Sequence, residues 1–305
     1  MRIQKYIKKT IISNIYTSFV YLFCQMMKIF KTQRTLKEHL NSIEGKLKVG
    51  FAPTMGSLHE GHLSLIRESK KRCDIVVCSI FVNPTQFNAV SDFEHYPKDY
   101  SGDIELLNSA GCDVLFLPND VNEVYQNEKQ VSVELGNLAN VLEGEHRPGH
   151  FDGVMRVVKL LFDIVEPDKA FFGLKDFQQF LVIQKMAKEL NMEIEVLGCD
   201  IVRDENGLAM SSRNKRLSNN ELKDALVLQK ALNHCKKNFR KMDLKALQAE
   251  CLGILQKESE PEYFEICDSE SLSPITEFSE SKKIRAFTAA SIGEIRLIDN
   301  MEIVQ

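Results

Sequence analysis

The sequence predicts an α/β fold, with a doubly wound parallel sheet and a smaller C-terminal α+β domain. Three observations predict it. From residue 46 to about residue 200, short apolar runs alternate with segments of helical periodicity, the pattern of strands that pair in parallel. Beyond about residue 203, helices come first and short strands follow. Polar segments rich in Gly or Pro begin where the strands end, which is where such sheets bind ligands.

The elements of the first domain follow from these patterns in chain order. Short apolar runs predict strands at residues 47–52, 74–82, 113–117, 169–172 and 193–197. Apolar residues that recur every three or four positions predict helices at 62–71, near 100–110, at 153–165 and at 176–190. Right-handed crossovers are expected to place these helices on the faces of one parallel sheet.

The second domain is expected to begin near residues 201–204. Two charged amphipathic helices are predicted near 219–239 and 243–257, followed by strands at 263–267, 284–287 and 294–297. The expected division is therefore 27–202 and 203–305.

Residues 1–26 stand apart from both domains. They carry four basic residues and no acidic one, followed by a moderately apolar run over 11–24. Polar residues interrupt this run, which makes it a poor transmembrane helix, and no small-residue cleavage motif follows it. We expect that the start codon has been assigned too early and that Met27 is the first residue; a targeting segment is the alternative.

Composition excludes several classes of protein. The chain has 305 residues, 44% of them hydrophobic and 27% charged, as in ordinary globular proteins. Its net charge of −4 gives no general attraction to nucleic acid or to anionic membranes. The eight cysteines are scattered singly without a Cys-x-x-Cys pair, which predicts small core residues in a reducing, cytoplasmic compartment.

The segment 53–62, PTMGSLHEGH, joins the first strand to the first helix. His59 and His62 are three residues apart at the start of that helix and therefore share a face. Two imidazoles beside the unpaired N–H groups of a helix terminus favour a phosphate ligand. Two surface histidines, or half of a metal site, would be the alternative, but no third His or Cys follows at ligand spacing.

Two further polar motifs fit a nucleotide. In the segment 207–214, GLAMSSRN, two hydroxyls and a guanidinium can wrap a polyphosphate, because Arg offers a planar fork of donors. A polar turn that caps the next helix is the alternative. Lys175 and Asp176 begin a predicted helix with Gln179 on the face of Lys175; an ordinary helix start with a solvated lysine would look the same.

Together these motifs resemble those of the pantoate–β-alanine ligase family, within the nucleotidyltransferases that carry a His-x-Gly-His signature. Residues 53–62 are similar to that signature, and Ser211-Ser212-Arg213-Asn214 to the second ATP signature. Other similar blocks are NPTQF (83–87), YPKD (96–99) with Asp103, RPGHFDGV (147–154), KDFQQ (175–179) and RLIDN (296–300). The resemblance covers about residues 27–305 and implies a Rossmann-like nucleotide domain with a smaller lid domain.

The resemblance implies an AMP-forming ligase that condenses (R)-pantoate with β-alanine through pantoyl adenylate. It implies catalytic roles for His59, His62, Lys175 and Arg213. The ATP site would also include Met55, Gly56, Ser57, Leu58, Glu60, Gly61, Gly173, Leu174, Asp176, Val202, Met210, Ser211 and Ser212. Asn83, Gln86 and Gln179 would bind pantoate and β-alanine, and Asp103 would bind Mg²⁺. A cytoplasmic homodimer without nucleic-acid or membrane partners is also implied.

Three positions depart from the family pattern. Lys98 stands where Arg is usual, Leu174 where a polar residue is usual, and Gly102 replaces a frequent acid, which leaves the Mg²⁺ ligand set open. Two other classes compete with this interpretation. Another adenylate-forming enzyme, such as an aminoacyl-tRNA synthetase, is opposed by the negative net charge and by the lack of a basic anticodon-reading domain. A non-catalytic ligand-binding homologue is opposed by the intact histidine and Ser-Ser-Arg-Asn motifs.

Overall fold

The computed structural model describes five stretches of the chain, residues 27–43, 45–86, 93–126, 133–278 and 283–304. The predictions for residues 1–26 lie outside them. Within the described stretches, no helix combines the length and the apolar character that crossing a bilayer requires.

Six parallel strands form the central sheet, in the order β1-β4-β3-β2-β5-β6. Their bounds are β1 Lys28–Phe30, β2 Val49–Thr54, β3 Ile75–Ile80, β4 Val114–Phe116, β5 Lys169–Gly173 and β6 Glu195–Cys199. The chain runs outward from β2 through β3 to β4, and later adds β5 and β6 on the other side of β2. The order therefore reverses between β2 and β5, where a doubly wound sheet opens a crevice for ligands. The predicted doubly wound sheet is confirmed.

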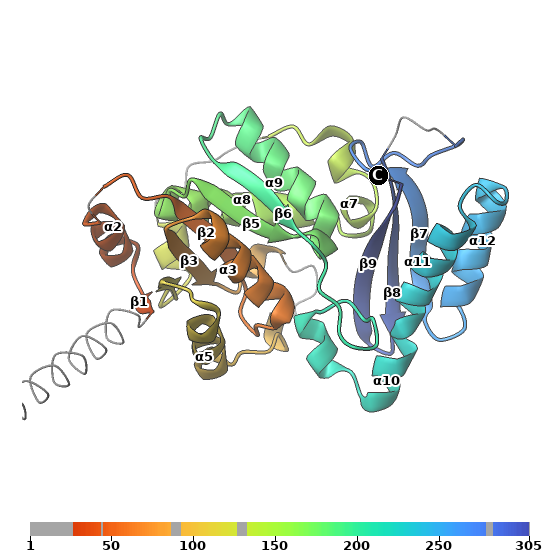
Figure 1. Ribbon diagram of the computed structural model, residues 1–305, viewed down its shortest axis with the longest axis horizontal. Coiled ribbons are helices and arrows are strands. Elements are labelled where there is room, and N and C mark those ends of the chain that lie inside the picture. The colour runs from red at the N-terminus through yellow and green to blue at the C-terminus, as the bar shows by residue number, and fades with distance from the viewer. Residues whose placement is uncertain (1–26, 44, 87–92, 127–132, 279–282, 305) are drawn as a thin grey trace, which may run out of the picture.

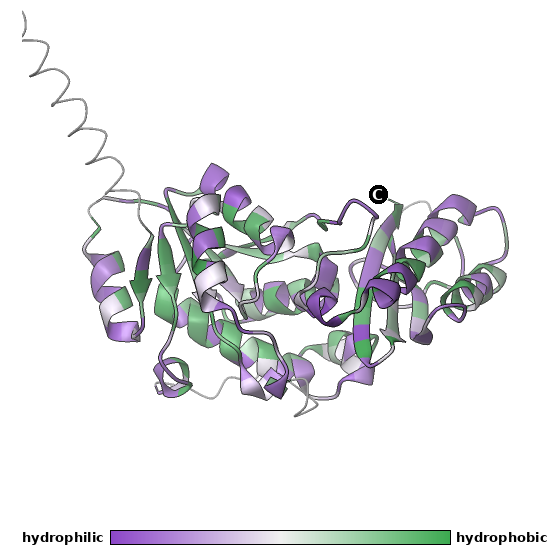
Figure 2. Ribbon diagram, turned by 90° about the horizontal axis from the view of Figure 1, so that it is seen from below, coloured by the Kyte–Doolittle hydropathy of each residue, from purple (hydrophilic) through white to green (hydrophobic). Residues whose placement is uncertain are grey.

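Helices cover both faces of this sheet (Figure 1). α3 (Glu60–Arg72) and α5 (Tyr100–Ala110) lie on one face, and α8 (His150–Val165) and α9 (Phe177–Glu189) on the other. Alternation along β2 supplies both cores: Phe51 packs with α8, whereas Ala52 packs with Leu63 and Ile66 of α3. Figure 2 shows largely apolar strands between helices that carry polar residues along one side.

The C-terminal part contains an antiparallel sheet of β7 (Glu260–Asp268), β8 (Ile284–Ile292) and β9 (Ile295–Val304), in that order. Helices α11 (Leu226–Asn238) and α12 (Leu244–Leu255) cover one face of it (Figure 1). Phe264 and Ala290 pack beneath these helices, whereas their neighbours Tyr263 and Ala289 belong to the core of the first domain. The small sheet is therefore buried on both faces, and its second face packs on the first domain.

The predicted elements differ from the structure mainly at their ends. The helix expected over 219–239 is two helices, α10 (Asn219–Asp224) and α11, separated at Ala225. The sequence carries no sign of this break: neither Gly nor Pro stands at it, and Ala225 itself keeps helical dihedral angles, φ −58° and ψ −23°. The three C-terminal strands are longer than predicted.

Several short elements were not predicted from periodicity. They are β1, α2 (Gln33–Asn41), η1 (Pro84–Gln86), α6 (Asn122–Tyr125), η2 (Gly136–Ala139), α7 (Glu143–His146), η3 (Leu174–Asp176) and η4 (Ser212–Arg216). Most have three to five residues, too few for a period to emerge. In α2 only Gln33 and Leu36 are buried.

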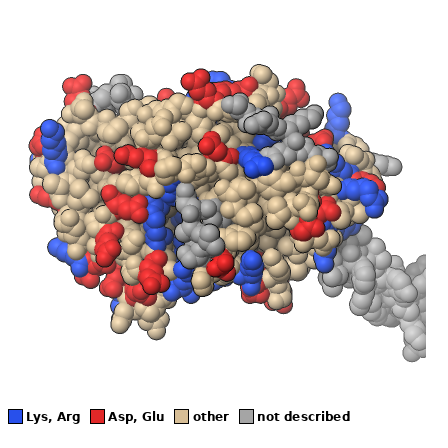
Figure 3. Space-filling view, turned by 180° about the vertical axis from the view of Figure 1, so that it is seen from behind, with Lys and Arg blue, Asp and Glu red and all other residues tan. Residues whose placement is uncertain are grey.

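On the face opposite to that of Figure 1, acidic and basic side chains are interspersed (Figure 3).

Candidate active site

Three segments that are distant in the sequence meet at the carboxyl ends of β2, β5 and β6. They are the turn 55–59 before α3, η3 after β5, and the loop that follows β6. Residues of all three line one cleft of about 610 Å³, which is open to solvent. The polar segments at the strand ends therefore converge on one edge of the sheet, as the sequence predicts.

The turn between β2 and α3 has a constrained backbone. Gly56 and Ser57 both have positive φ, 80° and 50°. A Cβ atom at Gly56 would lie 2.9 Å from Cγ2 of Ile80 and 3.0 Å from Oδ2 of Asp103, so this position requires glycine. The N–H groups of Ser57 and Leu58 donate to Oδ2 and Oδ1 of Asp103, at 2.8 and 2.7 Å.

Asp103 thus has a structural task that the sequence did not reveal. Its side chain sits in the first turn of α5, the residue is 2% exposed, and each carboxylate oxygen accepts one N–H group of the turn. No cluster of three or more His, Cys, Asp or Glu side chains suited to a metal occurs within the described stretches. Mg²⁺ binding by Asp103 stays a prediction.

Replacing Asp103 by Ala is expected to lower the free energy of unfolding by about 3 kcal/mol, because two buried N–H groups lose their acceptor. Urea unfolding without Mg²⁺ or ATP measures this loss. Asp99→Ala is the matched control: Asp99 caps the same helix through Gly102 but does not contact the turn. A loss that appears only when Mg²⁺ is present would contradict the structural task and favour the metal-ligand prediction.

His59 and His62 lie against each other at the start of α3. Their ring centroids are 4.0 Å apart, with the planes tilted by 31°. His59 is the N-cap residue, and its Nδ1 accepts the N–H of Gly61 at 3.1 Å. A Cβ atom at Gly61 would lie 2.9 Å from the His59 ring, so glycine lets the ring fold back over the helix. In the neutral ring the proton is then on Nε2, which is the donor nitrogen.

Both histidines are neutral near neutral pH. Burial, then His62, and then the charges of Lys175 and Lys215 lower the pKa of His59 to about 2. Burial, followed by the same two lysines, lowers the pKa of His62 to about 4. Nδ1 of His62 is buried and has no hydrogen-bond partner within the described part of the chain. These features suit an anionic ligand, which would balance the lysines and accept an imidazole N–H.

The free energy of unfolding is expected to fall as the pH drops from about 6.5 to about 4. The pKa of His59 is about 2, and the pKa values of His62 and His150 are about 4, against 6.5 for an ordinary histidine; burial is the main cause for all three. In this window the unfolded chain binds protons that the native state does not, with a slope of up to about 1.4 kcal/mol per pH unit for each histidine. Urea unfolding across the window measures the slope.

The same experiment separates these histidines from Glu143. Burial alone would raise the pKa of Glu143, but Arg296 holds it at about 2, so its contribution is present above 4.5 and is lost only below that pH. His62→Asn should make the slope between about 6.5 and 4.5 shallower. At lower pH His59, whose pKa of about 2 is lowered in part by His62, titrates alongside Glu143. A wild-type stability that stays flat through the upper window would contradict the neutral state of these histidines.

Lys175 reaches the cleft from η3, and its Nζ lies 3.2 Å from Oδ1 of Asp176. The second-domain motif approaches from the other side. Oγ of Ser212 donates to the carbonyl oxygen of Ser57 at 2.8 Å, and Oγ of Ser211 accepts the N–H of Arg213 at the start of η4. The bond of Ser212 thus holds the Ser-Ser-Arg motif against the turn 55–59, which we call the histidine turn.

Lys215 is a cation at this site that sequence reasoning missed. Its Nζ donates to Oγ of Ser57 at 3.1 Å and lies 3.5 Å from the carbonyl oxygen of Leu58. Lys215 stands two residues after Arg213. Its position next to the predicted phosphate-binding motif could have identified it as a site residue.

Some of the predicted ATP-binding residues line the cleft and others do not. Those that line it are His59, Gly61, His62, Gly173, Lys175, Asp176, Val202 and Met210. Those that do not are Met55, Gly56, Ser57, Leu58, Glu60, Leu174, Ser211, Ser212 and Arg213. Glu60 points its carboxylate to Arg67 at 2.7 Å. Asp200 and Ile201 also line the cleft; they directly follow β6, so the strand-end rule that located the other segments could have found them.

Asn83 and Gln86 lie in the loop after β3. Asn83 is buried: its Oδ1 accepts the hydroxyl of Tyr125 at 2.8 Å, and its Nδ2 donates to the carbonyl oxygen of Gly153 at 3.3 Å. Its polar atoms therefore shape the loop, and Nδ2 also approaches Oε1 of Gln86 at 3.3 Å.

The main chain of Gln86 is held from α8 and its preceding loop. Its carbonyl oxygen contacts Nδ1 of His150 at 2.9 Å and Nη2 of Arg147 at 3.3 Å, while its side-chain amide donates to Sδ of Met55. The RPGHFDGV block therefore positions Gln86 beside the histidine turn. Phe87 lies outside the described residues.

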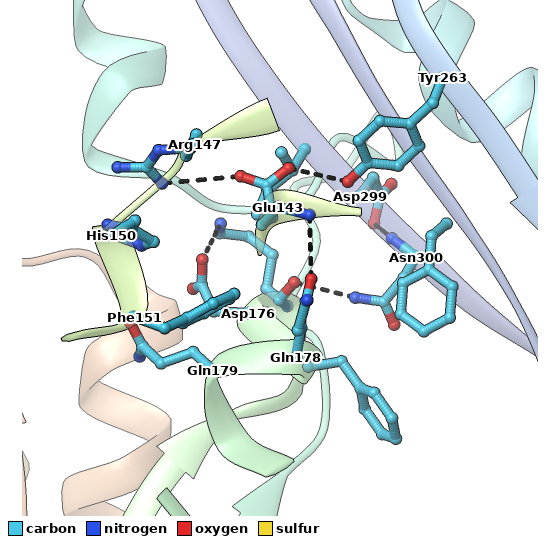
Figure 4. A pocket seen from close by; sticks show the side chains of 14 residues that line it. Glu143, Arg147, His150, Phe151, Asp176, Gln178, Gln179, Tyr263, Asp299 and Asn300 are labelled. Atoms are coloured by element: carbon cyan, nitrogen blue, oxygen red, sulfur yellow. Dashed lines mark hydrogen bonds and ion pairs between the residues drawn. The ribbon is translucent and has the colours of Figure 1, made fainter. Parts of the chain in front are cut away.

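A second cavity of about 410 Å³ adjoins the cleft (Figure 4), and Lys175, Asp176 and Gln179 line both. The adjacent glutamines differ in role. Gln178 is 4% exposed and holds the start of α7, since its Oε1 accepts the N–H of Glu143 at 3.0 Å. Gln179 faces the two cavities.

The three departures from the family pattern have local explanations or contacts. A Cβ atom at Gly102 would lie 2.4 Å from Oδ2 of Asp99, so an acid there would disturb the cap of α5. Nζ of Lys98 lies 5.7 Å from the ring centroid of Phe93. Leu174 packs where Gly198 leaves room, because a Cβ atom at Gly198 would lie 2.5 Å from its Cδ2.

Comparisons with known proteins show the family of this chain. The profile of the family described as pantoate-beta-alanine ligase matches residues 28–302. The chain is 44% identical to the pantothenate synthetase of Cytophaga hutchinsonii over 284 residues, 92% of this chain and 97% of that protein. It is 47% identical to the pantothenate synthetase of a Sulfurihydrogenibium species over 264 residues, 85% and 93% of the two chains.

Solved structures of the same family share the fold. The pantothenate synthetase of Thermus thermophilus superposes with a TM-score of 0.84 at 38% identity, over 92% of this chain and all of that one (100%). The pantoate-beta-alanine ligase of Francisella tularensis, whose structure is described as a complex with β,γ-ATP and β-alanine, superposes with a TM-score of 0.74 at 33% identity, over 91% and 98% of the two chains. The chain belongs to the pantoate–beta-alanine ligase family.

Proposed function

We propose that this chain is an ATP-dependent, AMP-forming ligase that joins (R)-pantoate to β-alanine. The observation that carries the proposal is the cleft at the β2/β5 crevice, where two neutral histidines and Lys175 meet in a member of this family. A carboxylate is a poor electrophile near neutral pH, so the reaction needs an activated acyl group.

The first step is adenylation. A carboxylate oxygen of pantoate attacks the α-phosphorus of ATP, the bond to the β-phosphate oxygen breaks, and pyrophosphate leaves. His59, His62, Lys175 and Arg213 stabilise the charge that develops on the phosphates, which is positioning and electrostatics more than covalent chemistry. Ser211 donates to phosphate oxygens, the hydroxyl of Ser212 holds the motif in place through the carbonyl oxygen of Ser57, and the main chain of Val202 holds adenine.

The second step is amide formation. The amine of β-alanine attacks the acyl carbon of pantoyl adenylate, the acyl–oxygen bond breaks, AMP leaves with that oxygen, and the amine loses a proton. Gln86 and Gln179 orient pantoate, and Asn83 holds the loop that carries Gln86. Cleavage of ATP thus supplies the leaving group for amide formation.

We propose that Mg²⁺ binds together with the nucleotide. The described residues offer no ready-made metal cluster, and Mg²⁺ commonly keeps its waters and binds through substrate phosphates. Bound there, it would neutralise charge on the triphosphate. The chain's own contribution is the set of N–H, hydroxyl, ammonium and guanidinium donors around the cleft.

The remaining proposals concern organisation. Residues 27–202 form the nucleotide domain, and residues 203–305 form a lid domain whose Ser-Ser-Arg motif closes over the triphosphate. The enzyme acts in the cytoplasm as a homodimer, as the family resemblance implies, and sedimentation velocity measures its mass directly. Binding of nucleic acid is not part of its function.

Exchange of labelled pyrophosphate into ATP tests the proposed reaction. With Mg²⁺ and without β-alanine, exchange should require pantoate, because the first step is reversible and its product stays bound. Exchange that depends on an amino acid, together with salt-sensitive tRNA binding, would instead favour an aminoacyl-tRNA synthetase. A folded chain that binds ATP but exchanges nothing with any acid would be a non-catalytic homologue.

A further inference from the structure

We infer that Asn300 and Asp299, on β9, are positioning residues that set the location of Lys175 in the cleft. The inference rests on the proposed function, because it assigns these residues to the adenylation site. It starts from Asn300, which is 2% exposed. Its Nδ2 donates to the carbonyl oxygens of Leu174 and Lys175, at 2.9 Å each. One side-chain amide thus holds two successive peptide groups of η3.

Asn300 is itself fixed in place by charged neighbours. Its Oδ1 accepts Nη1 of Arg285 at 2.7 Å, and its N–H donates to Oδ1 of Asp299 at 2.8 Å. The guanidinium of Arg285 lies over the ring of Phe177, 4.2 Å from its centroid, which anchors the first residue of α9. The whole side-chain amide of Asn300 is occupied by protein groups, so it acts through Lys175 and has no donor left for substrate.

Asp299 connects Asn300 to the part of the cleft that Val202 and Met210 line. It is 4% exposed and accepts a bidentate pair of bonds from Arg203, Nη1 at 2.7 Å and Nη2 at 2.9 Å. Arg203 directly follows Val202, whose carbonyl oxygen accepts the N–H of Met210 at 2.9 Å. Both Val202 and Met210 line the cleft.

The Arg203–Asp299–Asn300 cluster therefore ties the wall at Val202 to the loop that carries Lys175, across strand β9. Figure 4 shows Asp299 and Asn300 beside the cavity that adjoins the cleft. Strand β9 of the C-terminal sheet thus lines the cavity that adjoins the cleft. Loss of the Asn300 amide would leave two carbonyl groups unpaired and free η3 to shift. Displacement of a catalytic group by about 1 Å costs up to about 100-fold in rate.

The test is a pair of substitutions measured by pantoate-dependent pyrophosphate exchange. Asn300→Ala should lower kcat about 10- to 100-fold and change the KM for pantoate less than about threefold. Asn137→Ala is the matched control, because Nδ2 of Asn137 also donates to a carbonyl oxygen of the C-terminal part, that of Ser271 at 3.0 Å, but lies outside both cavities. It should retain kcat within about twofold.

A double-mutant cycle with Lys175→Ala separates positioning from general stability. If Asn300 acts through Lys175, Asn300→Ala should cost less than about threefold in the Lys175→Ala background. An equal loss in both backgrounds, or an Asn300→Ala enzyme as fast as the Asn137→Ala control, would overturn the inference. Should Asn300→Ala fail to fold, Asn300→Asp keeps the shape and the Arg285 contact, loses the donor, and is expected to show the same loss. Absence of exchange by the wild type would refute the proposed function instead.

Discussion

Replacing His62 by Ala is expected to lower kcat about 10²- to 10³-fold, the usual cost of removing one preorganised donor from a site where charge develops. His62 is half-buried and lines the cleft, its pKa is about 4, and its ring lies 4.0 Å from that of His59. The imidazole is therefore neutral near neutral pH, and in the proposed reaction it would stabilise the phosphate by donating an N–H. Steady-state formation of AMP from pantoate, β-alanine and ATP measures the effect.

Two further variants sharpen this test. His62→Gln keeps a neutral N–H donor and should recover part of the lost rate, whereas a histidine needed as a proton donor would not be replaced by an amide. His234→Ala is the control, because His234 lies on α11 and bonds to Glu250, away from the cleft. An unchanged kcat in His62→Ala would remove His62 from the mechanism.

Lys175→Ala is expected to lower the rate of pyrophosphate exchange by about 10²- to 10³-fold. Lys175 lines both cavities and is close enough to both histidines for its charge to lower the pKa of each. Without it, the transferring phosphate loses a cation that needs no reorganisation during the reaction. Lys185→Ala is the matched control, since Lys185 lies on α9 and bonds to the carbonyl oxygen of Leu135.

The pKa of His62 offers a second readout for Lys175. Removal of a nearby cation should raise the pKa of the His62 imidazole from its value of about 4, a shift that NMR titration of the free enzyme can follow. A variant with normal exchange and an unshifted His62 would place Lys175 outside the site. Loss of exchange with Lys185→Ala as well would indicate damage to α9 rather than to the phosphate site.

The parts of the site that could be predicted from the sequence are those with short-range signals. The histidine turn, the Lys175 loop and the Ser-Ser-Arg motif each combine unusual residues within a few positions, and each follows an apolar run or opens a polar turn. Gly61 illustrates why such a motif is local: its missing Cβ leaves room for the His59 ring two residues earlier. The alternation of strands and helices likewise predicts the sheet and its ligand-binding edge.

The parts that could not be predicted depend on contacts between distant residues. Asp103 bonds to Ser57 and Leu58, more than forty residues earlier, and nothing near Asp103 in the sequence distinguishes this task from metal binding. Asn300 reaches Leu174 and Lys175 across more than 120 residues. Such pairings are set by how β9 packs beside η3 and appear only when the chain is folded.

The fate of the pantoate carboxylate oxygen tests the central claim most directly. Pantoate labelled with oxygen-18 in its carboxylate is converted with ATP and β-alanine, and the nucleotide and phosphate products are analysed by mass spectrometry. Adenylation at this cleft predicts that AMP carries one labelled oxygen, because the oxygen that attacks the α-phosphorus leaves with AMP when the amine attacks the acyl carbon. Labelled inorganic phosphate together with ADP, or AMP without label, would contradict the account.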